Sequence, residues 1–112
     1  MSGSQGSGDG AAAAYGFTQA GAARFAVSGS MTFATAAALH AAGLAAFHAS
    51  SEPRLELDCA AVTAADSAGL AVLVDWLAWA RRSGRSLQLR NLPAKLVDIA
   101  RISELDELLV PA

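Results

Sequence analysis

The sequence predicts an α/β domain, in which a small mixed β-sheet of about four strands has its helices packed mainly on one face. Segments 54–59 and 86–91 alternate leucine with polar residues, which is the period of strands. Longer segments between them carry apolar residues at helical spacing. The elements therefore follow as strand, strand, helix, strand, helix, strand, helix, an order typical of α/β sheets.

Composition limits the class of protein. The chain has 112 residues, which suits one compact domain. Its net charge of -2 offers no dominant basic surface, so we expect no nucleic-acid partner. Hydrophobic residues make up 54% of the chain, but alanine supplies many of them, so the core must depend on the Leu, Val, Ile and Phe positions.

Residues 1–14 are mostly Gly, Ser and Ala, and we predict a disordered lead or a remnant of cloning there, with the domain over 15–112. This start lacks the basic and apolar regions of a secretory signal. The longest apolar run, of about a dozen residues, is broken by Asp75, whereas a membrane span needs roughly 20. We expect a cytoplasmic protein without a membrane span.

The elements can be placed along the chain from turn and capping signals. They are a hairpin over 15–29, a helix over 32–49 capped by Thr32 or Thr35, a strand over 54–59, a helix over 67–83, a strand over 86–91, a helix from Pro93 to 102, and a closing segment over 105–110. Gly84 is expected to end the second helix, whose last turn carries Arg81 and Arg82.

The stretch Val62–Leu70, "VTAADSAGL", lies where a strand gives way to a helix. Asp66 is a good helix N-cap, because its carboxylate can accept the backbone N–H of Ala68 or Gly69. Ser67 would then lie in the first turn, near the positive helix end, where a phosphate would be stabilised. Ala68 and Gly69 would keep the approach open for another backbone or side chain. The alternative is that the stretch is an ordinary capped helix start with no role in binding or phosphorylation.

The chain from about 17 to 110 resembles a STAS domain, the fold of anti-sigma-factor antagonists and of an accessory subunit of bacterial lipid-transport ABC systems. The residues that fit the family pattern in order are Asp58, Val62, Thr63, Asp66, Ser67, Gly69 and Leu70. In the sigma-factor regulators the hydroxyl residue after the Asp is phosphorylated. In the transporter subunits it lies at the contact with the ATPase. The resemblance implies that Ser67 is a phosphorylation switch or an interface residue.

Two departures favour the transporter branch. The sigma regulators usually carry Asp-Ser-Ser-Gly, but this chain has Ala68 in the third place. Their first loop often reads Gly-Glu-Leu-Asp, whereas Gly29–Thr32 here contains no acid. The segment resembles MlaB-type subunits instead. This implies a non-catalytic, cytoplasmic subunit that binds the ATPase (MlaF-like) of a phospholipid ABC transporter, and through it the permease at the inner membrane.

The resemblance leaves two other functions open. One is an anti-sigma-factor antagonist, whose partner is a serine kinase (the anti-sigma factor) and whose switch is phosphorylation of Ser67. The other is a STAS adaptor for a different complex. None of the three requires a cofactor, and we expect no enzyme activity, because the sequence shows neither a catalytic triad nor a phosphate-binding glycine loop.

Helical periodicity suggests a partner surface on the second helix. At 100° per residue, one face gathers core positions, namely Leu70, Leu73, Val74, Leu77 and Ala80. The opposite face gathers Ala68, Val72, Asp75, Trp79 and Arg82, with Trp76 beside them. Because Trp and Arg are common interface anchors, we predict that this face binds the partner. The alternatives are that a neighbouring helix covers Trp76, or that both rings lie flat on the surface.

Three other polar features are expected to be structural. His40 and His48 lie eight residues apart on one helix without a further ligand nearby, so we predict a surface helix and no metal site. Cys59, the only cysteine, is expected to be a small buried residue. Asp58 and Asp66 are not expected to form an acid–base pair.

Overall fold

The computed structural model describes residues 14–109, and the lead predicted for residues 1–14 lies outside this range except for Ala14. The strands are β2 (Tyr15–Gln19), β3 (Arg24–Met31), β4 (Arg54–Ala65) and β5 (Ser86–Arg90). The helices are α1 (Ala36–Ala49), α2 (Ser67–Arg82), α3 (Ala94–Ile102) and α4 (Asp106–Leu109). The predicted elements are confirmed in type and order. β4 continues well past the predicted end at residue 59.

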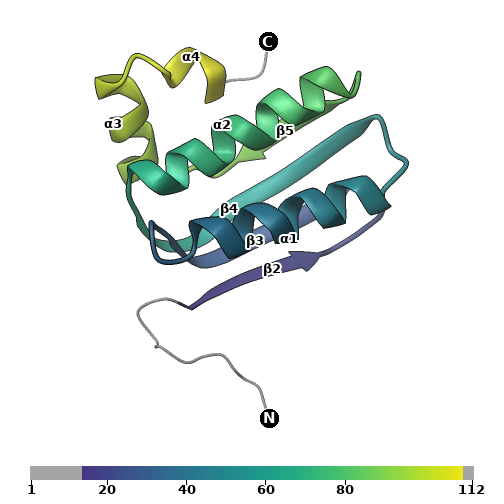
Figure 1. Ribbon diagram of the computed structural model, residues 1–112, viewed down its shortest axis with the longest axis horizontal. Helices are drawn as coiled ribbons and strands as arrows, with labels where there is room; N and C mark the ends of the chain where they lie inside the picture. The colour runs from purple at the N-terminus through teal and green to yellow at the C-terminus, as the bar shows by residue number, and fades with distance from the viewer. Residues whose placement is uncertain (1–13, 110–112) are drawn as a thin grey trace.

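The sheet is mixed, as predicted, with strand order β2-β3-β4-β5. β2 and β3 form the antiparallel hairpin, in which Phe17 faces Val27. β3, β4 and β5 run parallel, because a helix connects each to the next. Parallel strands end at one edge of a sheet, so the loops that lead into α1, α2 and α3 all lie at the same end of the molecule (Figure 1).

Helices α1 and α2 lie across one face of the sheet, and α3 and α4 lie at the end where the parallel strands finish (Figure 1). Alternation along β4 explains this arrangement: Leu55, Leu57 and Cys59 are buried beneath the helices. Burial raises the pKa of the Cys59 thiol to about 12, so this side chain is an inert core residue, as predicted.

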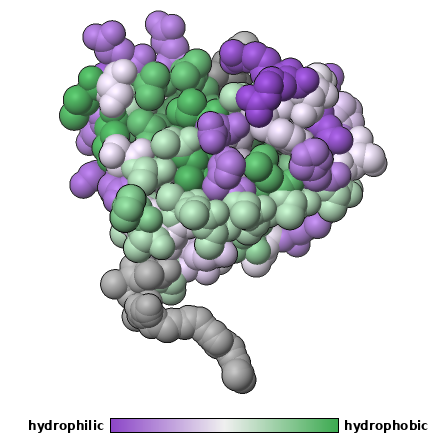
Figure 2. Space-filling view, viewed as in Figure 1, coloured by the Kyte–Doolittle hydropathy of each residue, from purple (hydrophilic) through white to green (hydrophobic). Residues whose placement is uncertain are grey.

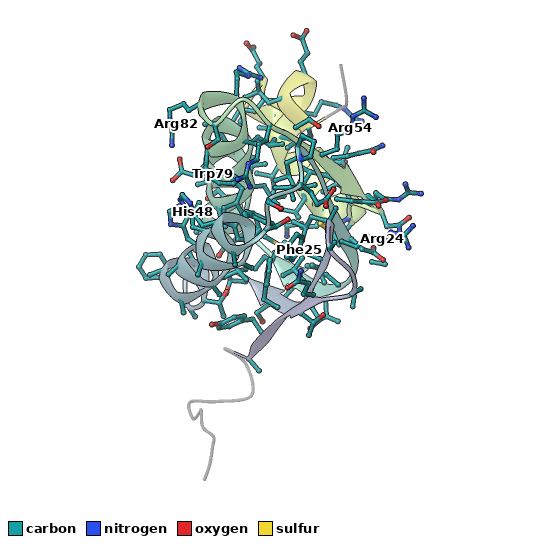
Figure 3. All side chains as sticks on the ribbon, turned by 90° about the vertical axis from the view of Figure 1, so that its right-hand side faces the viewer. Arg24, Phe25, His48, Arg54, Trp79 and Arg82 are labelled. Atoms are coloured by element: carbon teal, nitrogen blue, oxygen red, sulfur yellow. The ribbon has the colours of Figure 1, made fainter. Side chains whose placement is uncertain are left out.

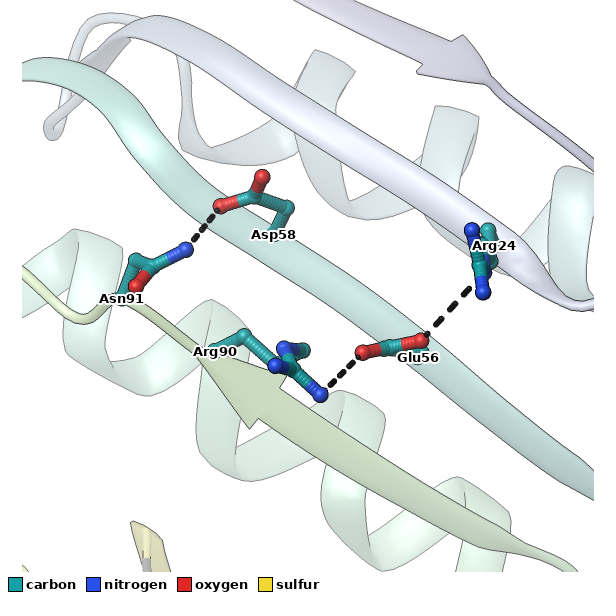
Figure 4. A network of polar contacts seen from close by, with 5 residues as sticks. All are labelled: Arg24, Glu56, Asp58, Arg90 and Asn91. Carbon is teal, nitrogen blue, oxygen red and sulfur yellow. Dashed lines mark hydrogen bonds and ion pairs between the residues drawn. The ribbon is translucent and has the colours of Figure 1, made fainter.

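The other face of the sheet is open, and arginine side chains project from it (Figure 3). Glu56 lies between Arg24 and Arg90, with N–O distances of 3.7 and 2.6 Å, and Asp58 accepts a hydrogen bond from Asn91 (Figure 4). The arginines are exposed and Glu56 is half-buried, so solvent screens these ion pairs and they contribute little to stability. The open face is therefore an ordinary solvated surface.

The core between the sheet, α1 and α2 is built around a cluster of five aromatic rings, each of which contacts at least one other. They are Phe17, Phe25, Phe47, Trp76 and Trp79. Trp76 occupies a notch in α1 at Gly43, where an added Cβ would lie 2.3 Å from the indole ring. Its Nε1–H donates to the His40 carbonyl at 3.2 Å. A helix with a side chain at position 43 could not pack this closely on α2.

The helix ends follow their predicted signals with one difference. Gly84 has φ of 72° and ends α2, where the N–H of Arg85 donates to the Ala80 carbonyl at 2.8 Å. Thr35 precedes α1 as expected, but its hydroxyl caps no N–H of the helix. Instead, it accepts the N–H of Thr32 and donates to the Ser30 carbonyl, which fixes the turn between β3 and α1.

Over residues 14–109, none of the helices combines the length and apolar character required to cross a bilayer.

Candidate partner-binding site

The predicted site lies at the edge where the parallel strands end. Asp66 follows β4 directly and opens α2, and its N–H donates to the carbonyl of Met31, the last residue of β3, at 3.2 Å. The β4–α2 loop is therefore joined to the β3–α1 loop. The two loops form one surface, which we call the loop edge and define as Thr32–Thr35 with Asp66–Gly69.

Asp66 holds the loop edge together. Its Oδ1 accepts the N–H groups of Ala68 and Gly69 at 2.9 and 3.2 Å, so it is the N-cap that the sequence predicted. Its Oδ2 accepts the N–H of Phe33 at 3.0 Å. Burial of the carboxyl opposes ionisation, but these three N–H donors and the positive charge of Lys95 hold the pKa of Asp66 below its usual range.

Ser67 is the first residue of α2, and its side chain is exposed, as predicted. The positive end of the helix lies beside it, but Asp66 already accepts the N–H groups of Ala68 and Gly69, so these donors are not available to a partner. Asp66 before it is half-buried and fixed by three hydrogen bonds. The hydroxyl is thus presented from a rigid backbone.

Gly69 makes room for another backbone, as expected, but that backbone is β3 of the same chain and not a partner. The glycine is buried, and an added Cβ would lie 2.0 Å from the Met31 carbonyl oxygen. Gly69 therefore allows the first turn of α2 to lie against the end of β3. Ala68 is half-buried, so it too offers little surface.

The predicted outer face of α2 is wrong in part. Val72, Trp76 and Trp79 have exposed fractions of 5%, 0% and 8%, so these side chains present no surface to a partner. The alternative that a neighbouring helix covers Trp76 is the one observed. The prediction from periodicity assumed that α2 packs only on the sheet. Because α1 also lies beside α2, the buried face of α2 is wider than predicted and includes both tryptophans.

Trp79 reaches the same inter-helix core near the other end of α2 (Figure 3). Its ring stacks on Phe47 at 5.7 Å, and its Nε1–H donates to His48 Nε2 at 3.2 Å. The Arg85 guanidinium lies 5.4 Å from the ring centre. His48 therefore has a structural partner.

Three residues of the predicted site remain exposed, namely Ser67, Asp75 and Arg82. Asp75 Oδ2 lies 3.2 Å from Nε2 of His40 on α1. The two histidines thus contact α2 rather than each other. Among the side chains that the structure describes, no group of three or more His, Cys, Asp or Glu could hold a metal ion.

Phe33 is the residue that sequence reasoning missed. Phe33 is 85% exposed, although its backbone N–H is bonded to Asp66 at the centre of the loop edge. Because it stands alone in a turn, outside any apolar period, no pattern singled it out. The available signal was its isolation as the one large residue in the run of threonines and alanines over 32–38.

Comparisons with known proteins identify the family. A family model described as "Mlab, STAS domain" matches residues 16–111. The chain belongs to the STAS-domain family. One solved structure with the same fold as this STAS domain is that of the anti-sigma factor antagonist SpoIIAA in its unphosphorylated form, with a TM-score of 0.67, 12% identity and 88% of each chain covered. A search of curated proteins found no match.

The geometry of this STAS domain suits recognition. The loop edge presents an exposed hydroxyl, an ionised acid whose oxygens are already bonded and an exposed phenyl ring, all on a rigid backbone. Asp58 lies on the open sheet face and Asp66 on the loop edge, and each is engaged by its own N–H donors. These two carboxylates have separate structural roles.

Proposed function

We propose that this STAS domain is a non-catalytic cytoplasmic subunit that binds and regulates the ATPase (MlaF-like) of an ABC transporter for phospholipid transport between bacterial membranes. The observation that carries the proposal is the match of residues 16–111 to a family model described as MlaB. Through the ATPase and the permease, the protein would be held at the inner membrane. The domain itself would bind no cofactor and carry out no chemistry.

The geometry of the loop edge supports docking through Ser67. This side chain is exposed on a backbone fixed by Asp66, so little conformational entropy would be lost on binding. A rigid domain seated on one state of the ATPase would stabilise that state. The shift in the equilibrium between the two ATPase states is set by the difference in the affinity of the domain for each state. Regulation of the ATPase would therefore depend on binding.

The proposal is tested with the purified ATPase subunit of the same host, by measuring the Kd with the wild-type protein and with Ser67→Arg. We expect Ser67→Arg to weaken binding at least tenfold, because a long charged side chain replaces a small hydroxyl at the contact. Gln88→Arg, on the open sheet face, is the matched control and should bind within twofold of wild type. A wild-type protein that does not bind the ATPase would refute the proposed function.

A second candidate is an anti-sigma-factor antagonist switched by phosphorylation of Ser67. Exposure of this hydroxyl at the positive end of α2 favours it, and the structurally similar SpoIIAA is an anti-sigma factor antagonist. Under this function, Ser67→Asp would lose binding to a serine kinase (the anti-sigma factor) of the host, whereas Ser67→Ala would retain it. Equal binding by both variants would remove this candidate.

A further inference from the structure

β4 is longer than the strand that pairs with it on the side of α3. The ladder between β4 and β5 ends at Asp58 and Arg90, whereas β4 continues to Ala65. Over these last residues, β4 is paired with β3 alone within the described sheet. The first of them is closed off, because the N–H of Ala60 donates to the Asp58 carboxylate at 2.9 Å. Residues 61–65 therefore form a strand edge that β5 leaves uncovered, and we call it the β4 edge.

A groove of about 350 Å³ follows the β4 edge. One wall is formed by Val62–Ala65, and the other by Pro93 and Lys95 at the start of α3. Thr63 in the middle of the groove has no partner residue on β3 or β5, because the β3 register passes from Val62 directly to Ala64. Such β-bulges are common beside functional sites. The groove therefore combines an uncovered strand with space along it.

We propose that this groove binds an extended segment of the ATPase partner, which adds a strand along residues 62–65 of β4 and places a carboxylate on Lys95. The inference rests on the proposed function and adds to it a second contact and the form of the partner segment. Strand addition is a recurring mode of peptide recognition, in which main-chain hydrogen bonds supply affinity. Because Ala65 leads directly into Asp66 and Ser67, one partner can reach both the groove and the loop edge.

The shape of the groove selects a single extended chain. A strand edge offers backbone N–H and C=O groups at strand spacing, and an extended segment can pair with them. A partner helix cannot, because its own backbone groups are already bonded within the helix. A second copy of this domain does not fit either. Its own β4 edge lies behind the same wall of Pro93 and Lys95, so two such edges cannot meet.

Lys95 determines the chemistry of the segment. It is the only charged residue that lines the groove, and it forms no ion pair with any side chain that the structure describes. The acids nearby have other partners: Asp66 accepts three N–H bonds, and Asp98 lies 3.7 Å from Arg101. A carboxylate on the incoming segment is therefore complementary. A nucleic acid or an anionic membrane needs several basic residues, whereas the most hydrophilic residues gather over the far end of α2 (Figure 2).

The test measures the Kd for the purified ATPase subunit with Ala64→Arg, which fills the groove, and with Lys95→Gln, which removes its charge. We expect the Kd to rise about tenfold or more for Ala64→Arg and about threefold for Lys95→Gln. The matched controls are Ala60→Arg, at an exposed alanine of β4 outside the groove, and Arg101→Gln on α3. Both controls should change the Kd by less than about twofold. Denaturant unfolding of each variant checks that it is folded.

Hydrogen exchange of the wild-type protein gives a readout on the backbone itself. We expect the amides of residues 61–65 to exchange about tenfold more slowly or less in the complex with the ATPase subunit, because an added strand bonds to this edge. The amides of β2, at the opposite edge of the sheet, should keep their exchange rates.

Each result has a separate meaning. If Ser67→Arg weakens binding while Ala64→Arg changes the Kd by less than twofold, the groove is not a contact and the proposed function stands. If residues 61–65 gain no protection in the complex, the partner adds no strand and the inference fails. If the wild-type protein does not bind the ATPase, both proposals fail. Two further results overturn the choice of occupant: protection of residues 61–65 in the free protein that is lost on deletion of residues 1–13, and self-association that Ala64→Arg abolishes in sedimentation.

Discussion

Trp76 and Phe33 are both large aromatic residues next to α1, and they have opposite environments. Trp76 is fully buried, whereas Phe33 is 85% exposed. Sequence reasoning placed Trp76 on the partner surface and did not consider Phe33. The difference arises from α1. Gly43 in the middle of this helix admits the indole ring, whereas the turn before the helix directs the phenyl ring into solvent.

The comparison shows that an aromatic residue's identity says little about whether it stabilises the fold or contacts a partner. The decisive feature is whether a helix or strand of the same chain lies against the aromatic side chain. Trp76 packs edge-on against Phe17 and Phe47, and its Nε1–H donates a hydrogen bond to the His40 carbonyl. Within residues 14–109, Phe33 takes part in none of the ring contacts of that cluster. Substitutions at the two positions should therefore separate folding from binding.

The largest expected effect is on Trp76. Trp76→Ala should lower the free energy of unfolding by about 3–5 kcal/mol, because it leaves a cavity between α1, α2 and the sheet. Denaturant unfolding of the purified domain measures this loss. Trp76→Phe, which keeps part of the ring volume, is the control and should cost less. A loss below about 1 kcal/mol for Trp76→Ala would mean that the ring is not core.

Gly69→Ala should give the next largest effect. The added Cβ would lie 2.0 Å from the Met31 carbonyl oxygen, a backbone atom that cannot move without breaking the hydrogen bond from the Asp66 N–H. We expect a loss of about 1–3 kcal/mol in denaturant unfolding. Gly21→Ala is the matched control, because its Cβ would find the nearest atom at 3.8 Å. Equal stability of the two variants would contradict the close approach of α2 to β3.

The elements were predictable because their signals are local. Alternation of Leu55 and Leu57 marks β4, Asp66 caps α2, and Gly84 ends it with positive φ. The alternating order of strands and helices then leads to the mixed sheet. Each of these features depends on residues within a few positions of one another, which is the range over which sequence patterns are informative.

The candidate site was only partly predictable, because it depends on contacts between distant segments. Asp66 and Ser67 were found from their place at a helix start. The burial of Trp76 depends on Gly43, and the fixed position of Phe33 depends on Asp66. The members of each pair are 33 positions apart in the sequence. Helical periodicity takes no account of a neighbouring helix of the same chain. The side of α2 that packs against α1 was therefore assigned to a partner.

Asp66 connects α2, which carries Trp76, with the turn that carries Phe33. Its carboxylate caps the helix and also accepts the backbone N–H of Phe33. Asp66→Ala should cost about 0.5–2 kcal/mol at pH 7 through loss of the cap. The folded-state pKa is lowered from the unfolded value of 3.8, so ionised Asp66 stabilises the fold above that pH. This contribution is lost as the pH falls through the folded-state pKa.

Denaturant unfolding of wild type and Asp66→Ala across this pH range tests the linkage. The gap in stability between the two proteins should be widest near neutral pH and should narrow below 3.8. Asp98→Asn changes an exposed carboxylate on α3 and should stay within about 0.5 kcal/mol of wild type at pH 7. A gap that widens on acidification would show that the carboxylate does not prefer its ionised form in the folded protein.

The smallest expected effect on folding is at Phe33. Phe33→Ala should change the free energy of unfolding by no more than about 0.5 kcal/mol, because the exposed ring loses little contact and the N–H bond to Asp66 remains. Denaturant unfolding under the conditions used for Trp76→Ala gives the direct contrast. If Phe33→Ala costs several kcal/mol, the ring is packed in solution, and a change in ATPase affinity in that variant would reflect misfolding. If stability is unchanged and affinity falls, the ring acts on the partner alone.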